Sequence, residues 1–158
     1  MEFVVAPMDR TAAEEIIGWR YDAPYSMYDG DTADVQAMLQ PEYRYQAVRD
    51  RDDRLVGFWN FGDDARVPGF AYSDAALDVG VGLRPDLTGH GVGIHFVRAA
   101  LDFARTGYGA QSLRVTVAAF NRRALRLTQA LGFREVGRFA QTDRHGASTD
   151  FVVLLLSR

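Results

Sequence analysis

The sequence predicts a single α/β or α+β domain in which helices pack on one layer of β-sheet. Its 158 residues suit one domain with a substantial core. The hydrophobic share of 47% and the charged share of 25% are those of an ordinary globular protein. Short runs typical of strands alternate with helical patterns along the chain. No repeat or linker interrupts them, so the domain is expected to span residues 1–158.

The N-terminal part is expected to hold a short strand, over residues 3–6, and two helices. The first helix runs over 9–20, because Asp9 or Thr11 can cap its free amides and apolar residues follow at helical spacing. The aromatic loop YDAPYSMYDGD separates it from a shorter helix that Pro41 ends.

The rest of the chain alternates strands and helices. Residues 43–48 and the run LVGFWNF flank the charged turn DRDD, which predicts a hairpin. A helix over 91–106 and another from Asn121 to Gly132, a residue suited to a left-handed cap, are expected among later strands. Those strands are predicted over 76–83, 113–118, 133–139 and 150–156.

Composition and charge exclude several classes of function. The net charge of −3 lacks the basic footprint of a general nucleic-acid binder. The absence of cysteine excludes disulfides, thiol nucleophiles and zinc–thiolate sites. All 18 basic residues are arginine, so neither a P-loop lysine nor a Schiff-base lysine exists. The apolar runs near both ends are too short for a signal peptide or a membrane span, so a cytoplasmic protein that binds no membrane is expected.

The stretch PDLTGHGVGIHF places three glycines between a predicted strand and a predicted helix. Such a turn directs the free N–H groups and the positive end of the helix dipole at the loop, and glycines let an anion approach them. The spacing is neither that of a Walker A loop, which needs lysine, nor that of a dinucleotide fingerprint on a first strand. A phosphate site is therefore expected at Thr88, Gly89, His90, Gly91, Val92 and Gly93. Glycines also interrupt the preceding strand, at Gly80 and Gly82, which indicates a bulge or a close backbone approach.

Two motifs together resemble the GNAT superfamily of N-acetyltransferases: LRPDLTGHGVG before a helix, and AAFNRRALRLTQALGFREVGRF after the next strand. The resemblance covers about residues 76 to 139, and the order of elements fits the entire chain. It implies the acyl-CoA N-acyltransferase (GNAT) fold. In that fold helices flank a central twisted sheet of about seven strands, mixed but mostly antiparallel.

The resemblance also implies acetyl-coenzyme A as the cosubstrate and no metal. The glycine loop would hold its pyrophosphate, the backbone of Val81 and Leu83 would pair with the pantetheine arm, and Asn121 would contact that arm. A backbone amide around 81–83 would stabilise the oxyanion. Arg122 and Arg123 are weaker candidates for contacts with the phosphates.

The implied reaction is direct acetyl transfer to an amine, which is a protein N-terminus, a polyamine or a small-molecule amine. The family usually places a tyrosine four residues before the Gly-Phe pair, as the acid that protonates the departing thiolate. Thr128 holds that position here and becomes the candidate acid. Because a thiol has a pKa near 8.5, loss of the tyrosine costs only about 2 kcal/mol at neutral pH. The missing tyrosine, and Thr88 where the family has Gln or Arg, leave open an alternative: a non-catalytic acyl-CoA-binding or sensor module.

An alkylamine, with a pKa near 10.4, must lose a proton before it attacks. Asp78, in the strand before the glycine loop, is the candidate base, and Asp74 is a weaker one. Aromatic residues are expected to line the acceptor pocket, since they suit a cation. Tyr25, Tyr28 and Trp59 are the chosen candidates, from a set that also holds Trp19, Tyr21 and Phe61. The three histidines lack metal-ligand spacing, and a homodimer through a strand edge stays open.

Overall fold

The computed structural model describes residues 2–158 and contains one seven-stranded sheet in the order β1-β2-β3-β4-β5-β7-β6. Neighbouring strands are antiparallel except β4 and β5, which are parallel. The strands are β1 (Val4–Pro7), β2 (Gln46–Arg49), β3 (Leu55–Phe61), β4 (Leu77–Leu83), β5 (Leu113–Ala118), β6 (Arg134–Thr142) and β7 (Ser148–Leu156). The predicted fold class is thereby confirmed.

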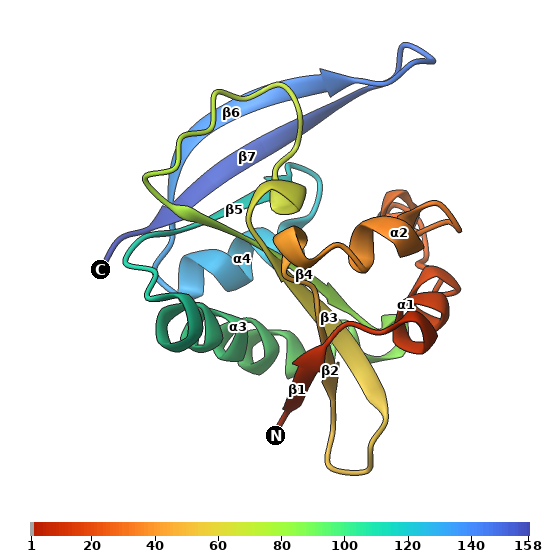
Figure 1. Ribbon diagram of the computed structural model, residues 1–158. Helices are drawn as coiled ribbons and strands as arrows, with labels where there is room; N and C mark the ends of the chain where they lie inside the picture. Colours follow the sequence, from red (N-terminus) through yellow and green to blue (C-terminus); the bar gives the residue numbers. More distant parts are fainter. Residues whose placement is uncertain (1) are drawn as a thin grey trace.

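Helices cover both faces of the sheet. The α-helices are α1 (Arg10–Ile17), α2 (Asp34–Met38), α3 (Val92–Tyr108) and α4 (Arg122–Ala130). Figure 1 shows α3 and α4 together on one side and α1 and α2 on the other. The larger core cluster lies under α3 and α4 and includes Trp59 and Phe96, whereas Ala13, Ile16 and Met38 belong to a smaller cluster under α1 and α2.

Two of the helices begin at the residues predicted to start them, and each has a side-chain cap. The Asp9 carboxylate accepts the N–H of Ala12 at 2.8 Å, and the Asn121 side-chain oxygen accepts the N–H of Ala124 at 3.2 Å. Each cap satisfies one of the amides that a helix start leaves free. Helix α1 ends earlier than predicted, at Ile17, because Gly18 follows as its cap.

Several strand bounds differ from the prediction for local reasons. Strand β2 begins at Gln46 because Pro41–Tyr43 forms a 3₁₀ turn and Arg44 adopts a left-handed conformation, with φ 53°. Strands β6 and β7 are longer than predicted, since they pair as a hairpin whose turn is held by the Asp143 side chain.

The pairing of β4 with β5 is brief, and this brevity shapes the site. The two strands pair only at Leu77 with Leu113 and at Asp78 with Arg114. Beyond Asp78 no residue of β4 pairs with β5, so the two strands separate toward their carboxyl ends, and we call the space between them the gap. We call the paired part the closed end of the gap and the diverging part its open end.

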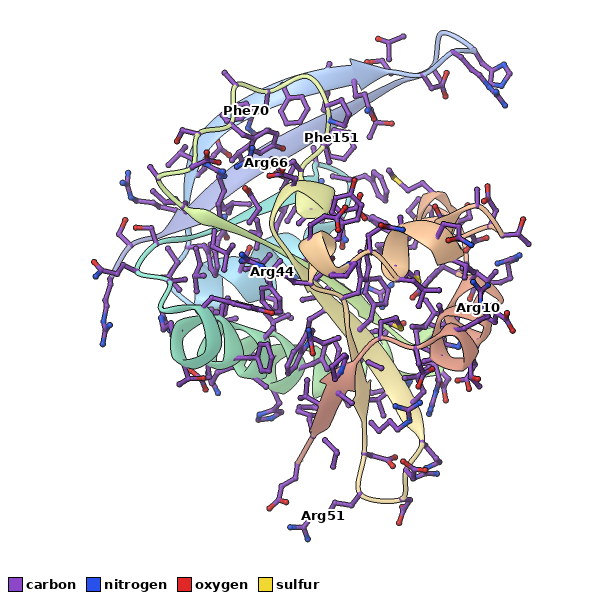
Figure 2. The ribbon with its side chains drawn as sticks, viewed as in Figure 1. Arg10, Arg44, Arg51, Arg66, Phe70 and Phe151 are labelled. Atoms are coloured by element: carbon purple, nitrogen blue, oxygen red, sulfur yellow. The ribbon has the colours of Figure 1, made fainter. Side chains whose placement is uncertain are left out.

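The loop between β3 and β4 covers one face of the β6–β7 hairpin (Figure 2). Phe70 in this loop packs on Phe139 at 5.5 Å between ring centroids, and Phe139 stacks on Phe151 at 5.5 Å. The aromatic contacts hold the loop beside the closed end of the gap. Arg66, at the start of the same loop, can therefore reach β4.

Candidate active site

The glycine loop turns β4 into α3 and leaves the start of the helix open. Gly89 and Gly91 have φ of 76° and 78°, a conformation that favours glycine. Gly91 is the N-cap of α3, no side chain caps the helix, and a Cβ atom added there would meet nothing within 4 Å. The first amides of this 17-residue helix therefore face the loop without a side-chain acceptor.

The other predicted loop residues play unequal parts. The Thr88 hydroxyl donates to the carbonyl of Pro85 at 2.7 Å and so stabilises the turn before the helix. His90 lies exposed in the loop, and Val92 begins α3. Gly93 has a packing reason for its lack of a side chain, because a Cβ atom there would lie 3.1 Å from Leu127 of α4.

Strand β4 presents backbone groups to the gap beyond its last pair with β5. The Asp78 carbonyl and the Arg84 N–H both bond to the β3 side, at 2.9 and 2.8 Å. Because these groups alternate in direction along a strand, Val81 and Leu83 direct their N–H and C=O groups toward the gap. Val81 is 43% exposed although its strand lies inside the sheet. Its exposure follows from the divergence of β5. No register shift marks a bulge at Gly80 or Gly82.

Those two glycines instead permit close approach from the neighbouring strand. A Cβ atom at Gly82 would lie 2.0 Å from the Phe58 ring, and one at Gly80 would lie 2.1 Å from the Asn60 side-chain oxygen. Phe58 and Asn60 therefore lie flat over β4, on the face that α1 and α2 cover.

The start of α4 lies beside the glycine loop. Arg123 places its guanidinium 3.1 Å from where a Cβ of Gly89 would stand. The same guanidinium lies over the Tyr25 ring, 4.3 Å from its centroid, and donates to the Tyr25 hydroxyl at 3.2 Å. A fixed positive charge therefore accompanies the open helix start, which suits a phosphate group.

The segment from Tyr21 to Tyr28 bridges the open end of the gap. At one end the Tyr21 hydroxyl donates to the carbonyl of Leu83 at 2.7 Å. At the other end the Asn121 side-chain amide donates to the Tyr28 hydroxyl at 3.2 Å. Phe120 packs against Tyr25 and Tyr28, with centroids 6.0 and 6.3 Å away. We call these eight residues the tyrosine strap, since they connect the ends of both diverging strands.

The tyrosine strap also walls a cavity of about 230 Å³. Tyr21 and Tyr28 line it from the strap, and Phe58 lines it from β3. Burial raises the pKa of Tyr21 to about 12, with the nearby Asp29 carboxylate as the second cause. Burial likewise raises the pKa of Tyr28. Both phenols therefore keep their protons at neutral pH.

The structure corrects the prediction that Asp78 is the general base. Its side chain is 2% exposed, and the Arg114 guanidinium donates two hydrogen bonds to it, of 2.7 and 2.6 Å. Arg66 adds a third, of 2.8 Å. Both oxygens of Asp78 are occupied by the two guanidinium groups, and burial shields them from an amine. Asp74 is exposed and bonds to Arg66 at 2.9 Å, so it belongs to the same network at the closed end.

The structure also corrects the roles predicted for Thr128 and Trp59. Thr128 is 4% exposed, and its hydroxyl donates to carbonyls of its own helix, those of Ala124 at 2.9 Å and Leu125 at 3.1 Å. Its proton is therefore not directed at a thiolate. Trp59 is 1% exposed and packs on Phe96 in the core under α3, so it does not line the cavity behind the tyrosine strap.

Of the predicted site residues, the glycine loop, the β4 edge, Asn121, Tyr25 and Tyr28 come together around the open end. Sequence reasoning missed Asn60 and the carboxylates of Asp29, Asp34 and Asp64, all in or beside the cavity region. The stretch YDAPYSMYDGD, in which acids stand next to tyrosines, is the one sequence signal for Asp29.

Comparison with known proteins agrees with this geometry. Residues 3–134 match the family model described as "Acetyltransferase (GNAT) domain". The chain belongs to the GNAT acetyltransferase family. No curated protein sequence matches it significantly. Within residues 2–158, no helix is long and apolar enough to cross a membrane, and no group of His, Asp and Glu is arranged to hold a metal ion.

Solved structures of GNAT acetyltransferases share the fold at low sequence identity. A chimera of Vibrio cholerae spermidine N-acetyltransferase SpeG with hSSAT has a TM-score of 0.78 at 18% identity, covering 99% of this chain and 96% of that one. The ribosomal-protein-alanine N-acetyltransferase of Brucella melitensis has a TM-score of 0.72 at 16% identity, covering 98% and 99%. A GNAT family acetyltransferase of Bacillus anthracis has a TM-score of 0.74 at 16% identity, covering 99% and 95%. At these identities the likeness shows the fold alone.

Proposed function

We propose that this GNAT protein transfers an acetyl group from acetyl-coenzyme A directly to a primary amine. The observation that carries the proposal is the unpaired edge of β4, which leads through an open glycine loop into the uncapped start of α3. Such a strand edge can pair with an extended amide-bearing arm, and the helix start can bind a diphosphate. The cosubstrate would supply an activated thioester at the open end of the gap.

The residues that would hold the cosubstrate follow from this geometry. The α3 amides beyond Gly91, together with Arg123, would bind the pyrophosphate. The N–H groups of Val81 and Leu83 would bind either the pantetheine amides or the oxygen that becomes negative during transfer. Asn121 would border the arm from the other side of the gap.

The transfer is direct, because the chain has no cysteine that could form an acyl-thioenzyme. The free-base amine forms a C–N bond with the carbonyl carbon while the C–S bond breaks. With Asp78 buried, we assign the proton of the amine to water. We assign protonation of the thiolate to the Tyr28 hydroxyl, which accepts from Asn121 and so has its own proton to donate. Tyr28 would then do the work of the family's usual tyrosine, whose position Thr128 occupies in this chain.

The experiment has a binding step and a turnover step. Coenzyme A binding is measured by calorimetry for the wild type, for Gly91→Glu and for Gly146→Glu. Gly146 is the matched control, because it also has a positive φ, of 83°, and open surroundings, but lies in the β6–β7 turn. We expect Gly91→Glu to lose binding and Gly146→Glu to retain it; equal affinities would overturn the phosphate cradle.

Turnover is measured as thiol release from acetyl-coenzyme A with peptides, polyamines and small amines at mildly alkaline pH. Amine-dependent release supports the transferase. Tight coenzyme A binding with no release for any amine would favour the non-catalytic acyl-CoA-binding or sensor module, to which the buried hydroxyl of Thr128 also points.

A further inference from the structure

The cavity behind the tyrosine strap has a chemistry that selects one class of ligand. Three aspartates line it, Asp29, Asp34 and Asp64, and no arginine or histidine does. Asp29 directly follows the strap and Asp34 begins α2, whereas Asp64 comes from the turn after β3. Negative charge therefore faces the cavity from two sides.

The three carboxylates are held in place without being neutralised. Asp29 accepts the N–H of Tyr21 at 2.8 Å, and Asp34 accepts the N–H of Asp31 at 2.9 Å. Asp64 accepts a short hydrogen bond from the Tyr45 hydroxyl. None of the ion pairs formed within residues 2–158 includes any of the three. Each carboxylate thus has no counter-ion within residues 2–158, and one of its oxygens lies outside these hydrogen bonds.

Aromatic rings form much of the remaining wall. They are Trp19, Tyr21, Tyr28, Tyr45 and Phe58. An aromatic face attracts a cation, most strongly where water is excluded. Elsewhere in residues 2–158 arginines lie over Tyr25, Tyr72 and Tyr108, but none lies over a ring of the cavity. The chain therefore supplies no cation of its own to these rings.

An independent feature beside the cavity is an unsatisfied polar group. Asn60 is 3% exposed, and its side-chain N–H₂ group has no hydrogen-bond partner among residues 2–158. Asn60 is two residues from Phe58 on β3, so both lie on the cavity face of the sheet. A buried donor without a partner is costly, which points to a ligand acceptor between the cavity and β4.

We propose that this cavity binds an aliphatic di- or polyamine as the acetyl acceptor, an inference that rests on the proposed function. Several carboxylates require more than one positive charge, so one ammonium group stays in the cavity while another amine reaches the thioester. The alkyl chain between them packs on the aromatic walls. Amines that carry a carboxylate are disfavoured, because no cation in the cavity would pair with it.

The position of the cavity supports this assignment. Two of its walls, Tyr21 and Tyr28, also contact the ends of β4 and α4, where the acetyl group would lie. A third wall, Phe58, lies over Gly82 of β4. Tyr21 and Tyr28 thus border both the cavity and the open end of the gap. Burial and the hydrogen bond to Asp64 raise the pKa of Tyr45, as expected beside an uncompensated carboxylate.

The test uses spermidine as the probe, with propylamine and glycine as comparison amines. Spermidine binding is measured by calorimetry without acetyl-coenzyme A, on the wild type and on Asp29→Asn, Asp34→Asn and Asp64→Asn. Asparagine keeps a hydrogen-bond acceptor at each position, so the fold is retained. Asp52→Asn is the matched control, since it removes one negative charge from an exposed hairpin turn, where the side chain is 78% exposed.

We expect each cavity variant to weaken spermidine binding by roughly fivefold to tenfold, and Asp52→Asn to leave it unchanged, with weaker binding at high salt. In turnover assays the cavity variants should raise KM for spermidine more than KM for propylamine, which carries a single positive charge, and Asp52→Asn should leave both KM values unchanged. Wild-type kcat/KM should rank spermidine above propylamine and glycine last.

The outcomes separate this inference from the proposed function. If propylamine is acetylated but spermidine affinity is the same in the wild type and the three cavity variants, the polyamine assignment is overturned. The transferase proposal then still stands. Aspartate-dependent spermidine binding without acetyl transfer to any amine would support the cavity assignment and overturn the transferase. A preference for glycine over spermidine would overturn the assignment as well.

Discussion

Aspartate side chains are bound differently at the two ends of the gap between β4 and β5. At the closed end Asp78 is buried and bound by two arginines, Arg66 and Arg114. Beside the open end Asp29, Asp34 and Asp64 line a cavity, and none of the three belongs to an ion pair formed within residues 2–158. A second cavity, of about 420 Å³, borders the closed end, but its Asp74 and Asp78 are already paired. The chain pairs the carboxylate that holds the sheet together, whereas the three at the first cavity are those we propose for a ligand.

Breaking the closed end should produce the largest effect. Asp78→Ala leaves Arg114 buried without its partner, and removing one member of a buried pair costs about 3–5 kcal/mol of unfolding free energy. Denaturant unfolding measures it. Asp74→Ala is the control, since its side chain is 96% exposed, and should cost about 1 kcal/mol or less. Similar losses for the two variants would contradict the view that burial makes Asp78 structural.

Changing the open end should affect the reaction more than stability. Tyr28→Phe keeps the ring and removes the proton proposed for the thiolate. If about 2 kcal/mol of acid assistance is lost, kcat should fall roughly thirtyfold. The alkaline limb of the pH–rate profile should change as well, while the midpoint of unfolding shifts little. An unchanged kcat would show that water protonates the thiolate.

The smallest effect is expected at the other anchor of the strap. Tyr21→Phe removes the hydrogen bond to Leu83, which contributes about 1 kcal/mol. In the wild type the pKa of the Tyr21 hydroxyl is raised to about 12, chiefly by burial. The folded protein therefore holds this proton more tightly than the unfolded chain, whose tyrosines titrate near pH 10. The resulting stability is present below pH 10 and is lost as pH rises toward 12.

A pH series of unfolding curves for the wild type and Tyr21→Phe checks this sign. The wild type should lose more stability than the variant between pH 10 and 12. Parallel curves would mean that the Tyr21 hydroxyl is not buried against Leu83 in solution.

Local features of the fold followed from sequence, whereas the partners of the catalytic candidates did not. Asp9 and Asn121 were predictable caps because an N-cap depends on three successive residues. The role of Asp78 depends on Arg114 and Arg66, which meet it only once β4 pairs with β5. A charged residue in the apolar run ALDVGVGL was the signal for such a buried partner.

The prediction at Thr128 failed for a reason that lies within its own helix. Threonine in a helix commonly donates back to the carbonyl four residues earlier, and here it does so to Ala124. Tyr28 differs from Thr128, because its hydroxyl bonds to a distant residue, Asn121, which is 93 residues away in the sequence. Contacts of that range are set by the folded sheet and cannot be read from spacing.

The unpaired edge of β4 has a consequence for amide hydrogen exchange. The N–H groups of Gly80 and Gly82 point toward β3, so they should exchange slowly, whereas those of Val81 and Leu83 face the gap and should exchange fast. A strand interior would thus show alternating fast and slow amides. An arm that pairs with this edge should slow only the fast set, so two amides report occupancy of the gap before any product forms.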